Sequence, residues 1–392
     1  MSDVRDSSTN YWVFPRCRTS SVKVAFICIL VLSLQSCGVT GAGNNGGGNN
    51  PNPTFTAFDA PRAGTRVDSG TYPQAINQGG DIVGWIYDSN LIVHSFVRAS
   101  TGAFTVFDAP GATARCCLGT FANSINSSGT VTGYFNDDNL NTHGFIRTQG
   151  GAITTFDVPG AAGAAAVGIN DAGAITGFTL DSNQHERGFV RASDGTFTTF
   201  DAPGVIGTGQ FVGTIPERIN AAGVVVGYFE DTNNANRGFV RAVDGTITVI
   251  DAPGAIPPCY CATYPKDINA SGAIVGLTGS AGTGGQSFLR APDGTFTVFT
   301  IPGAGTGGNQ GSSAVGISDN GLIVGNYLDS NTISHGYQRD SSGNITILDF
   351  PSIQVGGLGP FATVVMHVNS EGAILGTFYS IPIPVVHGFV RE

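Results

Sequence analysis

One unit of about 49 residues recurs seven times between Phe58 and the last residue of the chain. A repeat of this length constrains the fold strongly, because each unit packs only on its neighbours. Three anchors define the unit: a Phe-Asp-Ala-Pro run, an Ile-Asn-x-x-Gly turn followed by Val-Gly, and a His-Gly-Phe-x-Arg segment. The first anchor begins at Phe58, Phe107, Phe156, Phe200, Ile250, Phe299 and Leu348.

Each unit contains four short segments of strand character, separated by turn residues. In the third unit these segments are Ala165–Asn170, Ala174–Leu180, Arg187–Ala192 and Thr196–Pro203. The strands carry bulk on both faces, which is typical of sheets that are covered on both sides. Four-stranded antiparallel sheets stacked radially meet this requirement. The sequence therefore predicts an all-β fold, a seven-bladed β-propeller over residues 54–392.

Two further positions recur in every unit. A glycine follows the turn, and we expect it to mark where adjacent sheets approach most closely. An arginine ends the third strand, and its full recurrence favours a repeated structural hydrogen-bonding role over a ligand-binding ring. The glycines are Gly84, Gly133, Gly177, Gly227, Gly276, Gly325 and Gly376. The arginines are Arg98, Arg147, Arg191, Arg241, Arg290, Arg339 and Arg391.

The two ends of the repeat region predict how the ring closes. The last unit lacks a fourth strand, and Thr54–Pro61 is a spare one. Closing a loop of this length costs ~5 kcal/mol in chain entropy. About five hydrogen bonds at roughly 1 kcal/mol each, with burial of Phe55 and Phe58, can offset that cost. We therefore expect the spare strand to pair with the last blade.

A recurring basic residue on the third strand falls opposite the aspartate of the Phe-Asp-Ala-Pro run. In one unit both charges are absent together, with Gln286 and Thr300 in their places, as expected of residues that touch. Ring closure predicts one more pair, His387 with Asp59. Such exposed pairs set register more than they add stability. The others are His94 with Asp108, His143 with Asp157, Arg187 with Asp201, Arg237 with Asp251, and His335 with Asp349.

Residues 1–36 have the features of a signal peptide, in which basic residues precede an apolar run, Val24–Leu34, that is too short to span a bilayer. The segment Leu34–Gly38 resembles the lipobox of bacterial lipoproteins, so we expect Cys37 to be lipidated. The alternative is an ordinary secretory peptide cleaved nearby. Residues 37–53 form a flexible Gly/Asn/Pro tether. The protein is thus expected to be exported, as an outer-membrane or cell-surface lipoprotein, or as a periplasmic or secreted protein.

Charge limits the partners. Removal of residues 1–36, which hold four basic and two acidic residues, leaves 14 basic and 26 acidic residues and a net charge of −12. Lys266 is then the one remaining lysine. This balance argues against nucleic acid and against an anionic membrane surface, both of which call for basic patches. We expect a monomer that meets the membrane only through its lipid anchor.

Cysteines and histidines give no metal or cofactor site. Cys116 with Cys117, and Cys259 with Cys261, occupy matching loops of the second and fifth units, too far apart in a ring of seven to be bridged. Local bridges and free thiols both remain open. The repeated histidines would be spread around the circumference of a propeller, where they cannot converge on one ion.

Departures from the repeat are the better functional candidates, because binding sites on propellers are asymmetric. On the predicted innermost strands, which would line the central channel, the non-repeating polar residues are Gln74, Asn123, Glu217, Arg218, Lys266, Asp267 and His367. The longer loops add Tyr260 and Tyr264 at the channel mouth. Glu217 and Asp267 are the one carboxylate pair that could serve acid–base chemistry. No P-loop, HExxH, nucleophile elbow or dinucleotide fingerprint is present.

The combination Ile-Asn-x-x-Gly-x-Ile-Val-Gly with His-Gly-Phe-x-Arg resembles the bacterial HAF-repeat extracellular proteins. Their name comes from a His-Ala-Phe tripeptide, where this chain has glycine at Gly144, Gly336 and Gly388 and serine at Ser95. The resemblance spans nearly all of the mature chain. It implies an exported location and supplies no catalytic residues.

These observations favour an exported, lipid-anchored propeller that binds a glycan or a protein, with no catalytic residue assigned. One alternative is a carbohydrate-active hydrolase or lyase that uses channel carboxylates, and another is a structural envelope protein. Clustering of Glu217, Asp267 and His367 in one pocket would favour the enzyme. Aromatic residues exposed at one mouth would favour the binding module.

Overall fold

The structure is a computed structural model. It describes residues 54–181, 185–205, 213–233, 235–255, 263–279, 284–308, 310–351, 362–380 and 384–392. Residues 51–392 form one compact unit. The predicted signal peptide and the whole of the predicted tether, Cys37 included, lie outside the described residues, as do Tyr260, Cys259 and Cys261.

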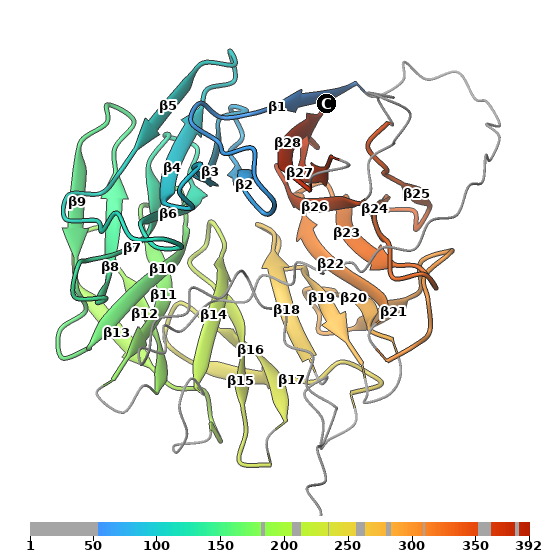
Figure 1. Ribbon diagram of the computed structural model, residues 1–392. Helices are drawn as coiled ribbons and strands as arrows, with labels where there is room; N and C mark the ends of the chain where they lie inside the picture. The colour runs from blue at the N-terminus through green and yellow to red at the C-terminus, as the bar shows by residue number, and fades with distance from the viewer. Residues whose placement is uncertain are drawn as a thin grey trace, which may run out of the picture. The chain divides into compact units, whose positions relative to one another are not determined.

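The described residues contain 28 strands, which follow one another around a common centre as seven four-stranded antiparallel blades (Figure 1). Five blades are separate sheets, and blades 7 and 1 are joined in one eight-stranded sheet by a parallel bridge between Gly70 and Val386. Blade 1 contains β2 (Gly70–Ile76), β3 (Ile82–Tyr87), β4 (Val93–Arg98) and β5 (Phe104–Phe107). Blade 2 contains β6 (Thr120–Ile125), β7 (Val131–Asn136), β8 (Thr142–Arg147) and β9 (Ile153–Phe156). Blade 3 contains β10 (Gly163–Ile169), β11 (Ile175–Leu180), β12 (Glu186–Arg191) and β13 (Phe197–Phe200).

The remaining four blades repeat this order. Blade 4 contains β14 (Thr214–Ile219), β15 (Val225–Glu230), β16 (Asn236–Arg241) and β17 (Ile247–Ile250). Blade 5 contains β18 (Thr263–Ile268), β19 (Ile274–Thr278), β20 (Gln286–Arg290) and β21 (Phe296–Phe299). Blade 6 contains β22 (Gly311–Ile317), β23 (Ile323–Leu328), β24 (Ser334–Arg339) and β25 (Ile345–Ile347). Blade 7 contains β26 (Thr363–Val368), β27 (Ile374–Tyr379), β28 (Val386–Arg391) and, from the other end of the repeat region, β1 (Phe55–Phe58).

The first strand of each blade is the innermost one. Each innermost strand contacts the next, and β26 returns to β2, so these seven strands enclose a central channel. Because all blades have the same up-and-down order, the innermost strands run in one direction. We call the end where they begin, which carries the loops after the Phe-Asp-Ala-Pro runs, the loop mouth. The other end carries the Ile-Asn-x-x-Gly turns.

The predicted closure is present. Strand β1 pairs with β28 in an antiparallel register that runs from Phe55 opposite Arg391 to Phe58 opposite Gly388. His387 Nδ1 lies 2.9 Å from Asp59 Oδ1, so the seventh pair is formed across the junction. The ring is therefore joined where the two ends of the repeat region meet, and the outermost edge of blade 7 is covered.

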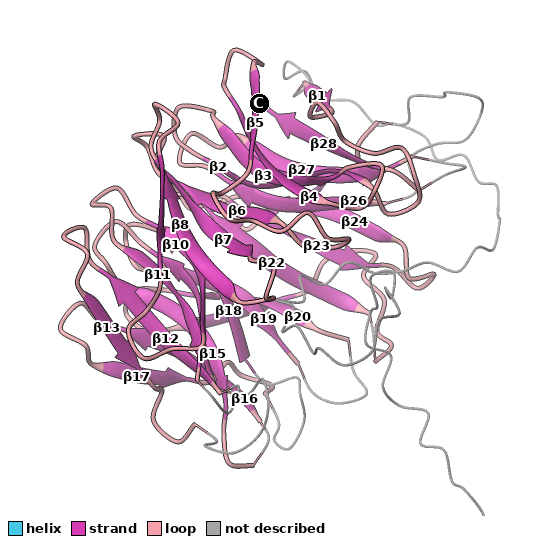
Figure 2. Ribbon diagram, turned by 60° about the vertical axis from the view of Figure 1, so that its left-hand side comes forward, coloured by secondary structure: helices cyan, strands magenta, loops and turns pink. Residues whose placement is uncertain are grey.

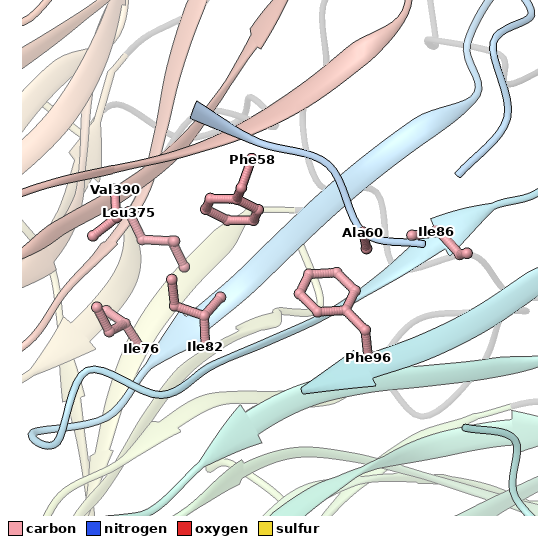
Figure 3. Packing of buried hydrophobic residues seen from close by; sticks show 8 residues of the cluster. All are labelled: Phe58, Ala60, Ile76, Ile82, Ile86, Phe96, Leu375 and Val390. Carbon is pink, nitrogen blue, oxygen red and sulfur yellow. The ribbon is translucent and has the colours of Figure 1, made fainter. Parts of the chain in front are cut away.

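A hydrophobic cluster stabilises this junction (Figure 3). Phe58 of β1 lies between Leu375 and Val390 of blade 7 and Ile82 and Phe96 of blade 1, and each of these side chains is less than 10 % exposed. Burying a phenylalanine of this kind stabilises a fold by about 1.5–3 kcal/mol. Phe58 thus joins blade 7 to blade 1 by packing as well as by strand pairing.

Side chains also pair in the other units as the register requires. His94 Nδ1 lies 2.8 Å from Asp108 Oδ1, and His143 Nδ1 lies 2.6 Å from Asp157 Oδ1. His335 Nδ1 lies 2.9 Å from Asp349 Oδ2. The two arginine units form equivalent ion pairs, Arg187 with Asp201 and Arg237 with Asp251.

The asparagines of the Ile-Asn-x-x-Gly turns form a belt around the axis. Each Nδ2 donates to the backbone carbonyl of the equivalent residue in the next blade, at distances from 2.9 to 3.2 Å. Each Oδ1 accepts the backbone N–H four residues later. The belt has one missing link, where Ser318 of blade 6 replaces asparagine and bonds within its own turn. The belt residues are Asn77, Asn126, Asn170, Asn220, Asn269 and Asn369.

The recurring arginines connect neighbouring blades through aromatic rings. Arg147 lies 4.9 Å from the ring centroid of Phe107, on the outermost strand of the preceding blade, and Nη1 of Arg147 donates to the Thr148 carbonyl. Where the preceding blade has Ile250 instead, Arg290 lies over Phe296 of its own blade. The arginines thus have a repeated structural role. They make the expected hydrogen bonds to the backbone, and they also make cation–π contacts.

The recurring glycines have a different role from the expected one. A Cβ on Gly84 would collide with the Tyr72 carbonyl oxygen of the same blade. The close approach is therefore between the first two strands of one blade, and not between adjacent blades. Similarly, Gly144 lies under the ring of Phe156, so a side chain there would displace the phenylalanine of the outermost strand.

Strand ends differ slightly from the predicted segments. The spare strand ends at Phe58 and β13 ends at Phe200, each three residues before the expected proline. The residues after these strands have other partners: Asp201 bonds Arg187, and the Ala202 amide donates to Thr214 Oγ1. In a second view the described residues consist of strands and loops (Figure 2). None of them forms a helix long and apolar enough to cross a membrane.

Candidate binding site at the innermost strands

Each innermost strand contains a β-bulge, and the bulge decides which side chains face the channel. Two residues of the bulged strand oppose one residue of the second strand. The neighbouring blades cover both faces of the sheet, so we take the extra residue at each bulge, which stays partly exposed, as the one that faces the axis. The bulge residues are Gln74, Asn123, Val167, Glu217, Lys266, Val315 and Met366, and all seven are partly exposed.

The residues that follow the bulges form a second level. Only three of them have an ionisable side chain: Arg218 of blade 4, Asp267 of blade 5 and His367 of blade 7. The second level consists of Ala75, Ser124, Gly168, Arg218, Asp267, Gly316 and His367. Charge and size are thus concentrated on one part of the ring, and the rest of this level is lined by small residues.

An ion pair joins blades 4 and 5 at the bulge level. Lys266 Nζ lies 2.7 Å from Glu217 Oε1, and the two side chains are 30 % and 25 % exposed. The same ammonium group lies 5.6 Å from the ring centroid of Tyr228 and 5.9 Å from that of Tyr264. The two tyrosine rings meet edge to face at 4.9 Å, and both residues are partly exposed. This group of four residues combines an aromatic platform with charged hydrogen-bonding groups.

A second ion pair lies deeper. Arg218 Nε is 3.5 Å from Asp267 Oδ1, a distance that allows electrostatic attraction without a hydrogen bond. Asp267 Oδ1 accepts the Ile268 amide, and Oδ2 accepts the Ile317 amide of blade 6. Burial raises the pKa of Asp267, and Arg218 and the two amides oppose that shift. The carboxylate therefore connects blade 5 to blade 6.

His367 faces the same part of the channel from blade 7. Burial, together with the positive charge of Arg218, lowers the pKa of His367 to about 3. The imidazole is therefore neutral at physiological pH. Its Nδ1 atom is buried and has no hydrogen-bond partner among the described residues.

The sequence candidates thus separate into two groups. The structure brings Glu217, Arg218, Lys266, Asp267 and His367 onto the two channel levels of blades 4, 5 and 7. Tyr264 was expected in a loop, but it lies on strand β18 beside Lys266. Asn123 lies elsewhere on the ring, where its Nδ2 donates to the Ala166 carbonyl of blade 3. Gln74 is on blade 1, away from the charged group. Tyr260 lies outside the described residues.

Sequence reasoning missed Tyr228, which stands on β15 directly after the recurring Gly227. The equivalent residue of blade 1, Trp85, contacts Phe121 of blade 2. The position after the glycine therefore reaches the innermost strand of the next blade. That signal can be used only once the order of blades and strands is known.

Sequence reasoning also missed a pair of carboxyl groups between blades 3 and 4. Glu186 is 7 % exposed, and its Oε2 has no hydrogen-bond partner among the described residues. Burial, together with the negative charge of Glu230, raises the pKa of Glu186 to about 7. The equivalent position is Val93 in blade 1 and Val386 in blade 7, so the acid departs from the repeat.

The described residues include the side-chain types that bind metal ions, and two adjacent cysteines. No group of three or more histidine, cysteine, aspartate or glutamate side chains there could hold a metal ion. The Sγ atoms of Cys116 and Cys117 lie 3.1 Å apart, longer than the ~2.05 Å of a disulfide bond.

Comparisons with known proteins give the fold. No protein-family model matches the sequence, and no curated protein matches it. A prolyl endopeptidase structure is similar with a TM-score of 0.51 and 12 % identity, over 81 % of this chain and 47 % of that one. This chain therefore spans about half the length of that enzyme.

Two other similar structures are the polysaccharide lyase Uly1 and the BP39L lectin from Burkholderia pseudomallei. Uly1 has a TM-score of 0.48 and 9 % identity, over 81 % of this chain and 88 % of that one. The lectin has a TM-score of 0.46 and 13 % identity, over 70 % of this chain and 83 % of that one. At these identities the likeness concerns the β-propeller fold and not the activity.

Proposed function

We propose that this protein is an exported, lipid-anchored β-propeller that binds a glycan or protein ligand at the loop mouth of its channel. One observation carries the proposal: Glu217 and Lys266 break the sevenfold repeat on the innermost strands, and the rings of Tyr264 and Tyr228 lie beside the Lys266 ammonium group. Aromatic faces pack against the apolar faces of sugar rings or against side chains, and charged groups next to them fix orientation.

The same geometry favours binding over catalysis. Glu217 is neutralised by Lys266, and both oxygens of Asp267 accept backbone amides. His367, with a pKa of about 3, cannot deliver a proton at neutral pH. Arg218 interacts electrostatically with both Asp267 and His367, but each of the two carboxylates already has a partner.

Export and lipid anchoring rest on the sequence. The apolar run Val24–Leu34 and the residues around Cys37 support them, as does the resemblance to HAF-repeat extracellular proteins. Metabolic labelling of the wild type and a Cys37→Ala variant with a radioactive fatty acid tests the anchor. Label in the wild type alone supports it, and a wild type without label refutes it.

A glycan array combined with turnover assays on the mature chain tests the binding function. We expect retention of one class of glycan without release of product. Tyr264→Ala should weaken that binding by roughly fivefold, since a ring stacked on tyrosine contributes on the order of 1 kcal/mol. Val364→Ala, at the same strand position of blade 7, is the matched control. Product release dependent on Glu217 or Asp267 would instead support a hydrolase or lyase.

A further inference from the structure

Two buried nitrogen atoms face the channel without partners. They are Arg218 Nε on blade 4 and His367 Nδ1 on blade 7, and neither has a hydrogen bond to a described residue. Buried polar groups in folded proteins are nearly always satisfied, so an exception calls for a water or a ligand. Other arginines with a buried, unpartnered Nε belong to the recurring set that stacks on phenylalanine. Among the residues that the structure describes, Arg218 has no such ring.

The two orphaned atoms belong to one group of residues. The charge of Arg218 acts on His367, although the two residues come from blades on different sides of the channel. Four second-level residues around them are small: Ala75, Ser124, Gly168 and Gly316. A long arginine can therefore extend across this level.

The balance of donors and acceptors is uneven here. Each Asp267 oxygen accepts one backbone amide, and Arg218 Nε lies 3.5 Å from Oδ1, where it is attracted to the carboxylate without a hydrogen bond. Lys266 has three N–H donors, of which the bond to Glu217 uses one. Arg218 has five donors in a planar fork that suits two oxygens at once. The group therefore offers more donors than acceptors.

We propose that Arg218, with His367 and Lys266 beside it, binds an anionic oxygen group, a carboxylate or a phosphate, carried by the ligand. This inference rests on the proposed binding function and names the chemistry of its ligand. An acidic sugar would place its ring on Tyr264 and Tyr228 and its carboxylate at Arg218. A phosphorylated ligand would use the same fork with a phosphate group.

The chemistry also predicts how binding depends on conditions. An anion next to the neutral His367 favours protonation of that imidazole, so binding should take up protons below neutral pH. The other titratable groups at the site, Glu217 and Asp267, are held by Lys266 and by backbone amides respectively. Affinity should also fall with added salt, as expected for a charge-assisted contact.

Isothermal titration of the mature chain with glucuronate, inorganic phosphate and glucose tests the inference. We expect one of the two anions to bind and glucose to bind less tightly. Arg218→Gln should weaken anion binding about 10- to 100-fold, the value of a charge-assisted hydrogen bond. Val315→Ala, at the bulge of blade 6, is the matched control and should bind as the wild type does.

The arms of the experiment separate the possible failures. Binding of glucuronate alone identifies an acidic sugar, and binding of phosphate alone identifies a phosphorylated ligand. If neither anion binds the wild type, or if the folded Arg218→Gln variant binds as the wild type does, the inference is wrong. A neutral glycan retained on the array in that case leaves the binding function standing. If Arg218→Gln fails to fold, Arg218→Lys keeps the charge but loses the planar fork, and it should also bind the anion more weakly.

Discussion

Replacing Ser318 by asparagine should complete the amide belt and stabilise the propeller. In six blades the belt asparagine donates to the next blade, and Ser318 is too short to reach the Asn369 carbonyl. The asparagine oxygen would take over the contact that Ser318 Oγ now makes with the Leu322 amide, as Asn269 Oδ1 does with Ala273. The variant therefore gains one buried hydrogen bond between blades 6 and 7 and gives up the partly buried bond that the Ser318 hydroxyl donates to Asn320 Oδ1 within its turn.

A buried hydrogen bond of this kind contributes about 0.5–1.5 kcal/mol. At about 2 cal/mol/K per residue, the unfolding entropy of roughly 340 residues converts 1 kcal/mol into a shift of about 1–2 °C in Tm. Because this shift is small, chemical denaturation should accompany the thermal melt. One structural fact favours acceptance of the larger side chain: the other six blades hold asparagine at this position.

The control is the reverse substitution in another blade, Asn220→Ser, which removes one existing hydrogen bond between blades 4 and 5. It should lower stability by a similar amount, about 1 kcal/mol. The reasoning would be refuted if Ser318→Asn destabilised the protein, or if Asn220→Ser left the denaturation midpoint unchanged.

Three further predictions follow from burial and charge. The pKa of Glu186 is raised to about 7 in the folded protein, so the free energy of unfolding should fall as pH rises from about 4.5 to 7. Glu186→Gln should remove this loss. In denaturation measured at pH 5 and pH 8, the variant should be the more stable protein at pH 8, by no more than about 3 kcal/mol. An unchanged pH profile in that variant would exclude a buried acid. The carboxylate of Asp349 raises the pKa of His335, so this pair stabilises the fold below pH 6.5 and loses that effect as pH rises through the pKa of the folded protein. An NMR titration should show a His335 midpoint above 6.5, and Asp349→Asn should lower that midpoint. Arg147→Met should cost about 0.5–1 kcal/mol by loss of its contact with Phe107 and with blade 1, and equal stability of the two proteins in urea would contradict that role.

Much of the fold could be predicted because comparison of the seven repeats shows which residues of neighbouring strands lie opposite one another. Loss of both charges at Gln286 and Thr300 indicated which residues of the third and fourth strands meet. The same reasoning then placed His387 against Asp59, residues separated by nearly the whole propeller, and the structure has them in contact. Strand ends were less accurate, because tertiary partners such as Thr214 for Ala202 decide where a strand stops.

Contacts between blades could not be predicted with the same ease. The belt asparagine recurs visibly in the sequence, but its partner is about one repeat away, as in Asn77 with Asn126. Arg147 likewise meets a phenylalanine of the preceding unit. Each partner is fixed by how consecutive sheets stack, and the repeat itself does not contain this information.

In the candidate site, too, the positions of single residues could be predicted and the contacts between blades could not. Lys266, Glu217, Arg218, Asp267 and His367 were found because they break the repeat on strands that had to be innermost. The ion pair between Lys266 and Glu217 and the position of Tyr228 depend on side-chain directions at the bulges and between blades. Glu186 was missed because it stands where the third strand begins, a position that the search for channel residues did not include.

Hydrogen–deuterium exchange of the mature chain tests the closed ring most directly. The account predicts that the amides of β1 between Phe55 and Phe58 exchange as slowly as those of an ordinary outermost strand such as β13, and that removal of residues 54–61 exposes the amides of β28. Rapid exchange of β1 in the intact chain, together with unchanged protection of β28 after the truncation, would contradict closure and with it the assignment of the channel.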